Sequence, residues 1–390
     1  MEEVLIVSGA RTPFGTYGGS LKDVDSTELG VIASKGAIER AGIPVEEIDN
    51  AVFGNVIQSS TNSPYIARHI ALKAGLPIQS AALTVNRLCG SGLQAVVSAA
   101  QSIRLGESHV SLVGGTESMS QAPYMLRNVR FGGGPKMDDM LTAALTDEYC
   151  GTGMGVTAEN LAKKYQISRE EQDQFAYESH MRAARARESG KLAEEIVPVT
   201  VKGRKGQETV VAEDEHIRPD TTLDKLARLK PVFLSDGTVT AGNSSGINDG
   251  AAALIVASES YVSRKGLKPL ARLVSWAVAG VEPSIMGIGP VAASKIALER
   301  AGLTIDDMDL VEINEAFAAQ YLSVEKELGL DRNKTNVNGG AIALGHPVGA
   351  SGARILLTLI YELKRRQAKR GLASLCIGGG QGITAIVEML

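Results

Sequence analysis

Cysteine and aromatic residues are scarce in this sequence. Only three of its 390 residues are cysteines (Cys89, Cys150 and Cys376), and aromatic side chains make up 4%. An odd and sparse set of cysteines argues against a secreted disulfide scaffold and indicates a reducing compartment. Residues 1–7 read as a strand and lack the basic segment of a signal peptide, and residues 388–390 are not a peroxisomal address. We therefore expect a cytoplasmic location.

Strong charge of one sign and long apolar runs are also missing. Lys and Arg total 40 and Asp and Glu total 44, which gives a net charge of −4 without a basic stripe. Nucleic acid and anionic membranes are therefore not expected as partners, and no apolar run is long enough to span a bilayer. Hydrophobic residues make up 44% and charged residues 22%. This composition is typical of globular proteins, and the length allows two to three domains.

The sequence repeats itself. Residues 33–42 (ASKGAIERAG) and 293–302 (ASKIALERAG) are identical at eight of ten positions, at an offset of 260. The same offset superposes residues 89–92 on residues 349–352, and each of these segments opens an apolar helical stretch. Matches that occur in the same order at nearly one offset indicate a duplicated unit.

An offset of 260 is too long for a simple tandem repeat in this chain, so we infer an insertion within the first copy. Residues 119–249 fit that role, since their central part is dense in charge and residues 168–171 form a capping-box pattern. The expected organisation is a first α/β half (residues 1–118 plus 250–270), an inserted loop domain (119–249) and a second α/β half (271–390).

Short strand-like runs alternate with helical patterns in both copies. The runs are residues 4–7, 110–113, 310–313, 375–377 and 385–387, and the helical patterns are residues 33–41, 93–105, 293–301 and 353–363. Such alternation predicts an α/β fold. The helices that follow residues 89 and 349 are apolar on most faces, as expected for helices buried between two sheets. The sequence thus predicts a duplicated, layered α/β sandwich.

Cys89 precedes the first of these apolar helices and is followed by Gly90 and Gly92. At a helix N-terminus, free backbone N–H groups and the helix dipole stabilise a thiolate, which is the nucleophilic form of cysteine. The glycines allow a second molecule to approach the sulfur and leave N–H groups free to hold an oxyanion. The alternative is a buried structural cysteine, and position alone leaves both interpretations open.

His346 is one of five histidines and the only one inside a glycine-rich turn, residues 339–349. By the repeat offset, this turn precedes the helix that corresponds to the helix after Cys89. We therefore expect the turn to bring His346 close to the Cys89 thiol, although a single histidine is more often structural. Pro347 fixes the backbone beside it.

Two further segments carry polar groups beside strand-like runs. Cys376 precedes a segment with four glycines in five positions, residues 378–382, which leaves backbone N–H groups and space for a ligand. The alternative is a tight turn after a core cysteine. Asn314 could orient a water or donate to a developing negative charge, but an isolated Asn is more often a helix N-cap.

Taken together, these segments resemble the thiolase family, the acetyl-CoA C-acyltransferases, over essentially the whole chain. The residues that carry the resemblance are 11–15, 86–92, 114–119, 314–317, 338–349 and 376–382. The resemblance implies the duplicated α/β core with an inserted loop domain. It also implies coenzyme A as a cosubstrate, without a permanently bound cofactor or a metal, and a homotetramer built from dimers.

The resemblance also carries roles to single positions. Cys89 matches the nucleophile that holds the acyl group as a thioester, His346 the base that activates it, and Cys376 the acid/base at the substrate α-carbon. Asn314, through a water, and His346 would line one oxyanion hole, and the backbone N–H groups of Cys89 and Gly378 the other. The positions that match coenzyme A contacts are Met154, Arg218, Phe233, Ala241, Ser245 and Phe317. Gly153 departs from the His that many biosynthetic thiolases carry beside that Met, which bears on acyl-chain preference.

The chemistry explains this choice of residue types. Cleaving a carbon–carbon bond beside a ketone needs a soft nucleophile and donors that stabilise an enolate leaving group. A second thiol with a pKa near neutral could then protonate the enolate. Three alternatives are less consistent with the sequence. A ketoacyl-carrier-protein synthase would carry a second His in place of Asn314, a Cys/His/Asn protease would leave the duplication unexplained, and an inactive binding protein would have lost Cys89, His346 or Cys376.

Overall fold

The first half of the molecule is a mixed sheet of five strands. In spatial order these are β4 (Ala81–Val85), β3 (Asn50–Gly54), β5 (Val110–Ser118), β12 (Asn248–Ser258) and β1 (Val4–Arg11). Strand β3 is parallel to both β4 and β5, whereas β12 is antiparallel to β5 and β1. A short strand, β2 (Gly15–Thr16), also pairs with β12. The computed structural model describes residues 2–203 and 206–390.

The second half repeats this arrangement. Its spatial order is β14 (Leu310–Ile313), β15 (Arg370–Ile377), β16 (Gln381–Met389) and β13 (Ala271–Gly280). The first pair of strands is parallel and the next two pairs are antiparallel, as in the order β3, β5, β12 and β1 of the first half. Even the register shifts agree, since β1 has one between Ile6 and Ser8 and β13 has one between Leu273 and Ser275. All five strand-like runs and the duplication inferred from the sequence are therefore confirmed.

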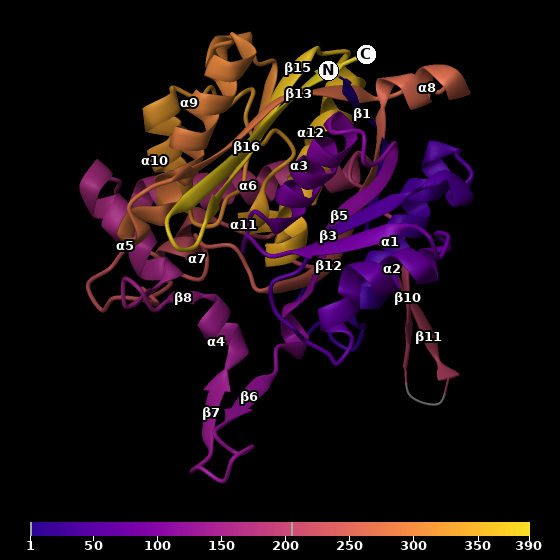
Figure 1. Cartoon of the computed structure of the whole chain (residues 1–390). Helices are drawn as coiled ribbons and strands as arrows, with labels where there is room; N and C mark the ends of the chain where they lie inside the picture. The colour runs from indigo at the N-terminus through magenta and orange to yellow at the C-terminus, as the bar shows by residue number, and fades with distance from the viewer. Residues whose placement is uncertain (1, 204–205) are drawn as a thin grey trace.

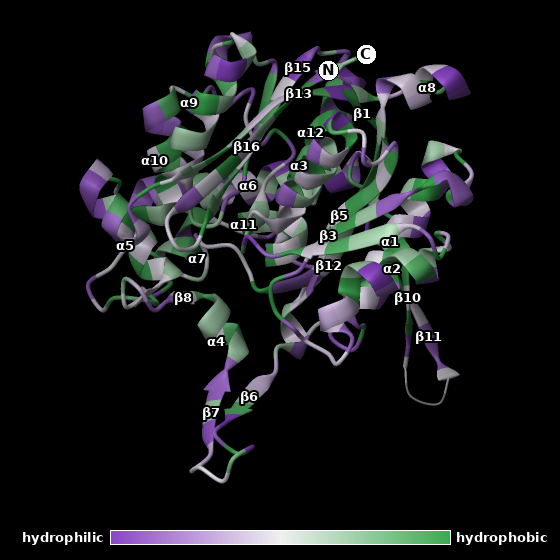
Figure 2. Ribbon diagram, viewed as in Figure 1, coloured by the Kyte–Doolittle hydropathy of each residue, from purple (hydrophilic) through white to green (hydrophobic). Residues whose placement is uncertain are grey.

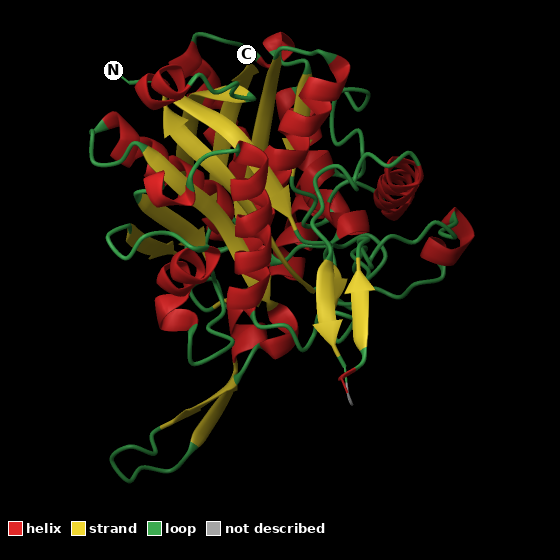
Figure 3. Cartoon of the chain, turned by 90° about the vertical axis from the view of Figure 1, so that its right-hand side faces the viewer, coloured by secondary structure: helices red, strands yellow, loops and turns green. Residues whose placement is uncertain are grey.

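The two half-sheets join at their edges. Leu5 pairs with Arg272 and Ile6 with Ala271, so β1 and β13 connect the strands into one continuous sheet (Figure 1). The sequence pattern predicted two separate sheets, and it contains no signal for this edge contact, because only two residue pairs form it. Figure 3 shows the strongly twisted strands with helices on both sides.

Helices divide the molecule into five layers. The core around α3 (Ser91–Arg104) and α12 (Val348–Arg366) contains residues of both half-sheets, so these two helices lie between them. Helices α1 (Ser26–Ala41) and α2 (Ile66–Ala74) cover the outer face of the first half, and α9 (Gly289–Ala301) and α10 (Ala318–Leu328) that of the second. The four predicted helices are all present, and the αβαβα sandwich expected from the sequence is confirmed.

The burial pattern of β1 shows how the sequence builds these layers. Successive side chains of a strand point to opposite faces. Val4 and Ile6 pack into the core around α3 and α12, whereas Leu5 and Val7 pack under α1 and α2. Because both faces are covered, the strand is apolar throughout instead of alternating. Figure 2 shows the same hydrophobic colouring along the central strands.

The central helices approach each other at glycines. An ideal Cβ built on Gly92 of α3 would lie 2.7 Å from the backbone N of Ala353, and one on Gly352 of α12 would lie 2.3 Å from the backbone N of Leu93. Gly92 and Gly352 are related by the offset of 260 residues. Two backbones can come this close only without a Cβ between them, so this contact sets how the starts of α3 and α12 face each other.

The long segment between β5 and β12 leaves the sandwich and returns. Ser168 forms the expected capping box with Glu171 at the start of α6. The hairpin β6–β7 projects away from the body of the molecule (Figure 1). The elements of this segment are β6 (Tyr124–Arg127), β7 (Lys136–Asp139), α4 (Met140–Ala144), β8 (Thr146–Asp147), β9 (Thr152–Gly153), α5 (Met154–Tyr165), α6 (Arg169–Glu188), β10 (Val199–Lys202), β11 (Glu208–Val211) and α7 (Leu223–Ala227).

Two short helices complete the fold, α8 (Glu259–Lys265) and α11 (Ala341–Leu344). The first follows β12, and the second lies in the glycine-rich turn just before His346. Among the described residues, no helix is both long and apolar enough to cross a membrane.

Candidate active site

Cys89 lies in the turn between β4 and α3, and its side chain is half-buried. Leu88 before it has a φ of 45°, a left-handed conformation that a leucine rarely adopts. The serine two residues after Cys89 holds this turn, because Ser91 Oγ accepts from the backbone N of Arg87 (2.9 Å) and donates to the carbonyl of Leu88 (2.6 Å). Strain of this kind persists only where the surroundings enforce it.

Opposing effects set the pKa of the Cys89 thiol. Burial raises it to about 11, while hydrogen bonds from the backbone N–H groups of Gly378 and of Cys89 itself lower it in part, and the nearby Glu117 raises it. The N–H groups at the helix N-terminus therefore favour the thiolate as expected, but burial has the larger effect. Desolvation outweighs the N–H donors, so the thiol needs a base when it attacks.

His346 supplies an uncharged imidazole. Burial lowers its pKa to about 3, and the positive charge of Arg354 adds to this. Its backbone N donates to Asn248 Oδ1 (3.0 Å), which fixes the turn, and Gly345 before it has a φ of 102°. Its Nδ1 lies 2.6 Å from Ser351 Oγ on the first turn of α12. At neutral pH the ring is therefore neutral and can accept a proton.

Asn314 meets His346 from the other side. Its Nδ2 lies 3.4 Å from His346 Nε2, and its Oδ1 has no partner among the described residues although it is buried. The N-cap interpretation of Asn314 is wrong, because α10 begins four residues later, at Ala318. The Asn314 amide and the His346 ring instead form a buried polar pair.

Cys376 is the last residue but one of strand β15 and is fully buried. It packs with Met286 and Ala316, and Met154 and Phe317 border the same cluster. Burial and the neighbouring Cys89 raise its pKa well above the usual range, so the expected near-neutral pKa is wrong. The cause is again desolvation, which no local sequence pattern reveals. Cys376 therefore holds its proton in the resting protein.

The glycines after Cys376 form the turn that faces the nucleophile. Gly379 and Gly380 have φ values of 78° and 77°, which favour glycine. Gly378 supplies the N–H that reaches the Cys89 sulfur. An ideal Cβ on Gly378 would lie 3.2 Å from Leu88 Cδ1 and 3.3 Å from Met154 Sδ. The backbone of Gly378 thus lies against both the Cys89 turn and the start of α5.

Four of the residues assigned to coenzyme A lie around this cluster, namely Met154, Phe233, Ser245 and Phe317. The rings of Phe233 and Phe317 meet edge to face with centroids 6.0 Å apart. The backbone N of Ser245 donates to the carbonyl of Ala316 (2.9 Å), which places it beside Cys376. Ala241 and Arg218 are exposed. Met154, Phe233 and Phe317 therefore offer an apolar surface near the two cysteines, and Arg218 offers an exposed cation.

Sequence reasoning missed three residues that build this site, namely Glu117, Asn248 and Ser351. Buried Glu117 accepts from the backbone N of Gly349 (2.9 Å) and of Ile57 (3.0 Å), so it ties the start of α12 to the loop after β3. The repeat offset gave one signal, since Ser351 corresponds to Ser91. No sequence signal pointed to Asn248 or Glu117, because the residues that they contact lie far away in the chain.

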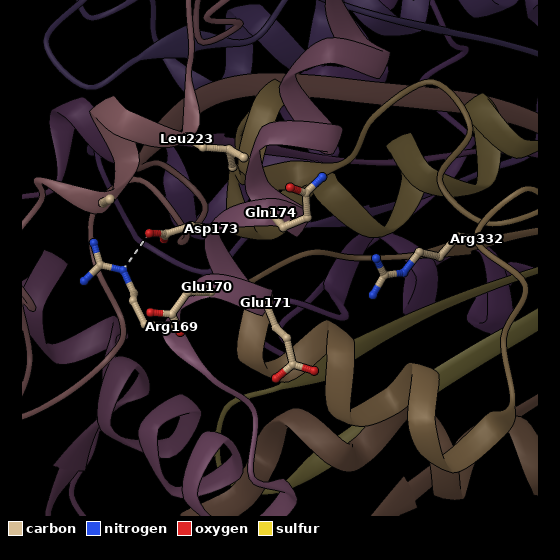
Figure 4. A pocket seen from close by; sticks show the side chains of 8 residues that line it. Arg169, Glu170, Glu171, Asp173, Gln174, Leu223 and Arg332 are labelled. Carbon is tan, nitrogen blue, oxygen red and sulfur yellow. Dashed lines mark hydrogen bonds and ion pairs between the residues drawn. The ribbon is translucent and has the colours of Figure 1, made fainter.

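A cavity of about 490 Å³ lies between α6 and α7, away from the cysteines (Figure 4). Arg169 Nε donates to Asp173 at its wall (2.8 Å), and Asp173 in turn accepts from Asn243 (2.9 Å). This wall therefore supports the loop that carries Ala241 and Ser245. Arg169 and Asp173 pair with each other, and Arg332 pairs with Glu325 (2.7 Å), which indicates a structural role.

The chain matches two family models, "Thiolase, N-terminal domain" over residues 4–260 and "Thiolase, C-terminal domain" over residues 267–389. It belongs to the thiolase family. Human mitochondrial 3-ketoacyl-CoA thiolase is 53% identical over 99% of this chain and 98% of that protein. The acetyl-CoA acetyltransferase of Paracoccus denitrificans is 50% identical over the full length of both.

Solved structures agree with this assignment. The crystal structure of human mitochondrial 3-ketoacyl-CoA thiolase has a TM-score of 0.97 at 52% identity and covers 100% of this chain and 99% of that one. The same human protein in complex with CoA gives a TM-score of 0.96. The acetyl-CoA acetyltransferase of Bacillus anthracis gives 0.97 at 49% identity. The family and the fold predicted from the sequence are therefore confirmed.

Proposed function

We propose that this member of the thiolase family transfers acyl groups between carbon and coenzyme A through a thioester on Cys89. In one direction it cleaves 3-ketoacyl-CoA to acetyl-CoA and a shortened acyl-CoA, and in the other it condenses two acetyl-CoA molecules. Two observations support this proposal: the N–H of Gly378, two residues after Cys376, hydrogen-bonds to Cys89, and Asn314 Nδ2 lies 3.4 Å from His346 Nε2. Cys89 also packs against the cluster that contains Val348, two residues after His346. The curated relatives are named for both directions.

The first half-reaction needs a thiolate that the resting site does not contain. The pKa of Cys89 is raised to about 11 and that of His346 is lowered to about 3. Proton transfer before attack is therefore unfavourable, so the proton moves to His346 as the sulfur attacks the carbonyl carbon. The N–H groups of Cys89 and Gly378 then hold the oxygen on which negative charge develops.

Cleavage releases an enolate, which must gain a proton at carbon. Cys376 is suited to give it, since its raised pKa keeps the thiol protonated. The Asn314–His346 pair stabilises the enolate oxygen. In the condensing direction Cys376 takes the α-proton from acetyl-CoA instead. A buried thiolate is costly, so this step depends on the Asn314–His346 pair to stabilise the enolate oxygen as the proton moves.

Coenzyme A fits the surface described above as a substrate. The apolar surface of Met154, Phe233 and Phe317 suits the pantetheine arm, and we place Ser245 and Ala241 at its border. The exposed guanidinium of Arg218 suits a phosphate group. Gly153 precedes Met154, and an ideal Cβ there meets only Leu145 O, at 3.7 Å. We infer that this space admits acyl chains longer than that of acetoacetyl-CoA.

Two exposed surfaces support a homotetramer built from dimers. Strand β4 is a free sheet edge in the described chain, and Leu83 on it is 51% exposed. On the hairpin β6–β7, Tyr124, Phe131 and Met137 are 65%, 94% and 67% exposed. Unpaired edges and large apolar patches are normally covered in solution. We propose that two chains form a dimer through the edge strand β4, and that two dimers join through the hairpin β6–β7.

We also propose a cytoplasmic location, supported by the three free cysteines. The mammalian relatives are named as mitochondrial, and the mitochondrial matrix is the alternative that cell fractionation would detect.

The test of the proposed function is the covalent intermediate. After incubation with acetyl-CoA, intact-mass analysis should show one added acetyl group per chain. The adduct should disappear in Cys89→Ala and remain in Cys150→Ala, since Cys150 lies outside the site. An adduct of equal yield in Cys89→Ala would refute the assignment of the nucleophile.

A further inference from the structure

Ser91 and Ser351 occupy equivalent positions in the two copies, 260 residues apart on the first turns of α3 and α12. In both copies the hydroxyl turns back to the catalytic turn that precedes its helix. Ser91 contacts the turn of Cys89, and Ser351 contacts the turn of His346. The duplication therefore provided one serine for each turn, and the two hydroxyls can be compared directly.

The roles of the Ser91 hydroxyl are fixed by its partners. A backbone N–H can only donate and a carbonyl can only accept, so Ser91 Oγ accepts from Arg87 and donates to Leu88. Ser351 makes a similar pair of contacts with two different partners. Its Oγ donates to the carbonyl of Pro347 (2.9 Å), which lies four residues before it, whereas Leu88 lies three residues before Ser91. His346 Nδ1 (2.6 Å) stands where Ser91 has the backbone N–H.

The contacts of Ser351 favour one of the two neutral forms of the His346 ring. A hydroxyl has one proton and two lone pairs. If the proton of Ser351 goes to Pro347, Oγ must accept from Nδ1–H, and the lone pair of the ring then lies on Nε2. Nε2 is the nitrogen next to Asn314 Nδ2 (3.4 Å), which can donate to it. The neutral ring thus presents its basic nitrogen to the reacting groups.

We propose that Ser351 is a positioning residue that sets the tautomer of His346 and holds its ring. The inference rests on the proposed role of His346 as the base. When Nε2 has taken the proton of Cys89, Nδ1–H still donates to Oγ, so the imidazolium keeps its partner.

Removing the hydroxyl leaves Nδ1–H without a partner in a ring that is only 6% exposed. A buried donor without an acceptor is unfavourable, so the ring will turn or change tautomer. We expect kcat of Ser351→Ala to fall about 10- to 100-fold, the usual effect of losing a group that orients a histidine. The KM for acyl-CoA should stay nearly constant, and Ser351→Thr, which keeps the hydroxyl, should recover most of kcat.

The matched control is Ser34→Ala. Ser34 is also buried on a helix and donates to a carbonyl four residues before it (2.6 Å), but it contacts no histidine. Ser34→Ala should lose some stability and keep kcat. Thermal unfolding of each variant, measured in parallel, shows whether Ser351→Ala and Ser351→Thr fold.

The decisive experiment is a double-mutant cycle on alkylation of Cys89 by iodoacetamide, which needs no acyl-CoA. Ser351→Ala and His346→Ala should each slow alkylation at neutral pH, and Ser351→Ala should add nothing in the His346→Ala background, because it acts through His346. Additive effects, or wild-type alkylation in Ser351→Ala, would overturn the inference. Failure of the wild type to form acetyl-Cys89 would instead refute the proposed function.

Discussion

Helices α3 and α12 are in contact at Gly92 and Gly352. Replacing Gly352 by alanine should change the free energy of unfolding in two opposite ways, because alanine favours the helix but does not fit the contact. Replacing glycine by alanine within a helix normally stabilises it by about 1 kcal/mol. In Gly352→Ala, however, the new Cβ would lie 2.3 Å from the backbone N of Leu93 and 2.9 Å from its Cβ. Ordinary contacts begin near 3.4 Å, so the helices must separate locally by about 1.1 Å.

Overpacking of this kind typically costs about 1–3 kcal/mol, and a backbone atom cannot rotate away as a side chain can. Subtracting the gain in propensity of about 1 kcal/mol, we expect the free energy of unfolding of Gly352→Ala to fall by up to about 2 kcal/mol. The starts of α3 and α12 carry the turns of Cys89 and His346. Misplacement by about 1 Å can cost on the order of 100-fold in rate, so kcat should fall steeply.

Urea unfolding followed by circular dichroism measures the first quantity, and thiolysis of acetoacetyl-CoA measures the second. Gly134→Ala is the control, since no atom lies within 4 Å of its ideal Cβ. It should change the unfolding free energy by less than about 0.5 kcal/mol. If Gly352→Ala were more stable than the wild type and equally active, the close contact would not exist and the reasoning would be wrong.

Four further results are expected. In Cys376→Ser, acetyl-enzyme should still form from acetyl-CoA in deuterated water, while deuterium uptake at the methyl carbon falls by about 10²–10⁴-fold; exchange at the wild-type rate would assign the α-carbon base to another residue. Gly153→His should reduce turnover of long 3-ketoacyl-CoAs more than that of acetoacetyl-CoA, and an equal reduction would place Gly153 outside the acyl site. Burial lowers the pKa of His180 and His216 to about 4 from 6.5, so the unfolded chain binds more protons below pH 6.5 and stability falls as the pH drops towards 4. Each buried histidine contributes about 1.4 kcal/mol per pH unit in that window, and His180→Gln should flatten the pH dependence of urea unfolding, which an unchanged slope would contradict. Light scattering should give a tetramer of 41.0 kDa chains, dimers for Phe131→Ser and smaller species for Leu83→Lys; a wild-type monomer would refute both interfaces.

Much of the fold is determined by local sequence. The periodicities of strands and helices depend on neighbouring residues, so residues 310–313 were predicted with the bounds that the structure gives. The duplication was visible because residues 33–42 and 293–302 still share most of their side chains. The glycines around Cys89 and His346 also marked the two turns, since backbone requirements of this kind are recorded directly in the residue type.

Other properties were decided only by tertiary structure. Cys89 precedes a helix, which by itself lowers the pKa of a thiol, yet burial by distant segments raises it to about 11. Burial likewise raises the pKa of the Cys376 thiol above its usual range. The left-handed Leu88 has no signal in the sequence, because a leucine adopts that conformation only when its surroundings enforce it. Two partners of His346 come from other parts of the chain, Asn248 from strand β12 and Asn314 from the loop after β14. Desolvation and long-range hydrogen bonds depend on which segments meet, and only the folded chain brings those segments together.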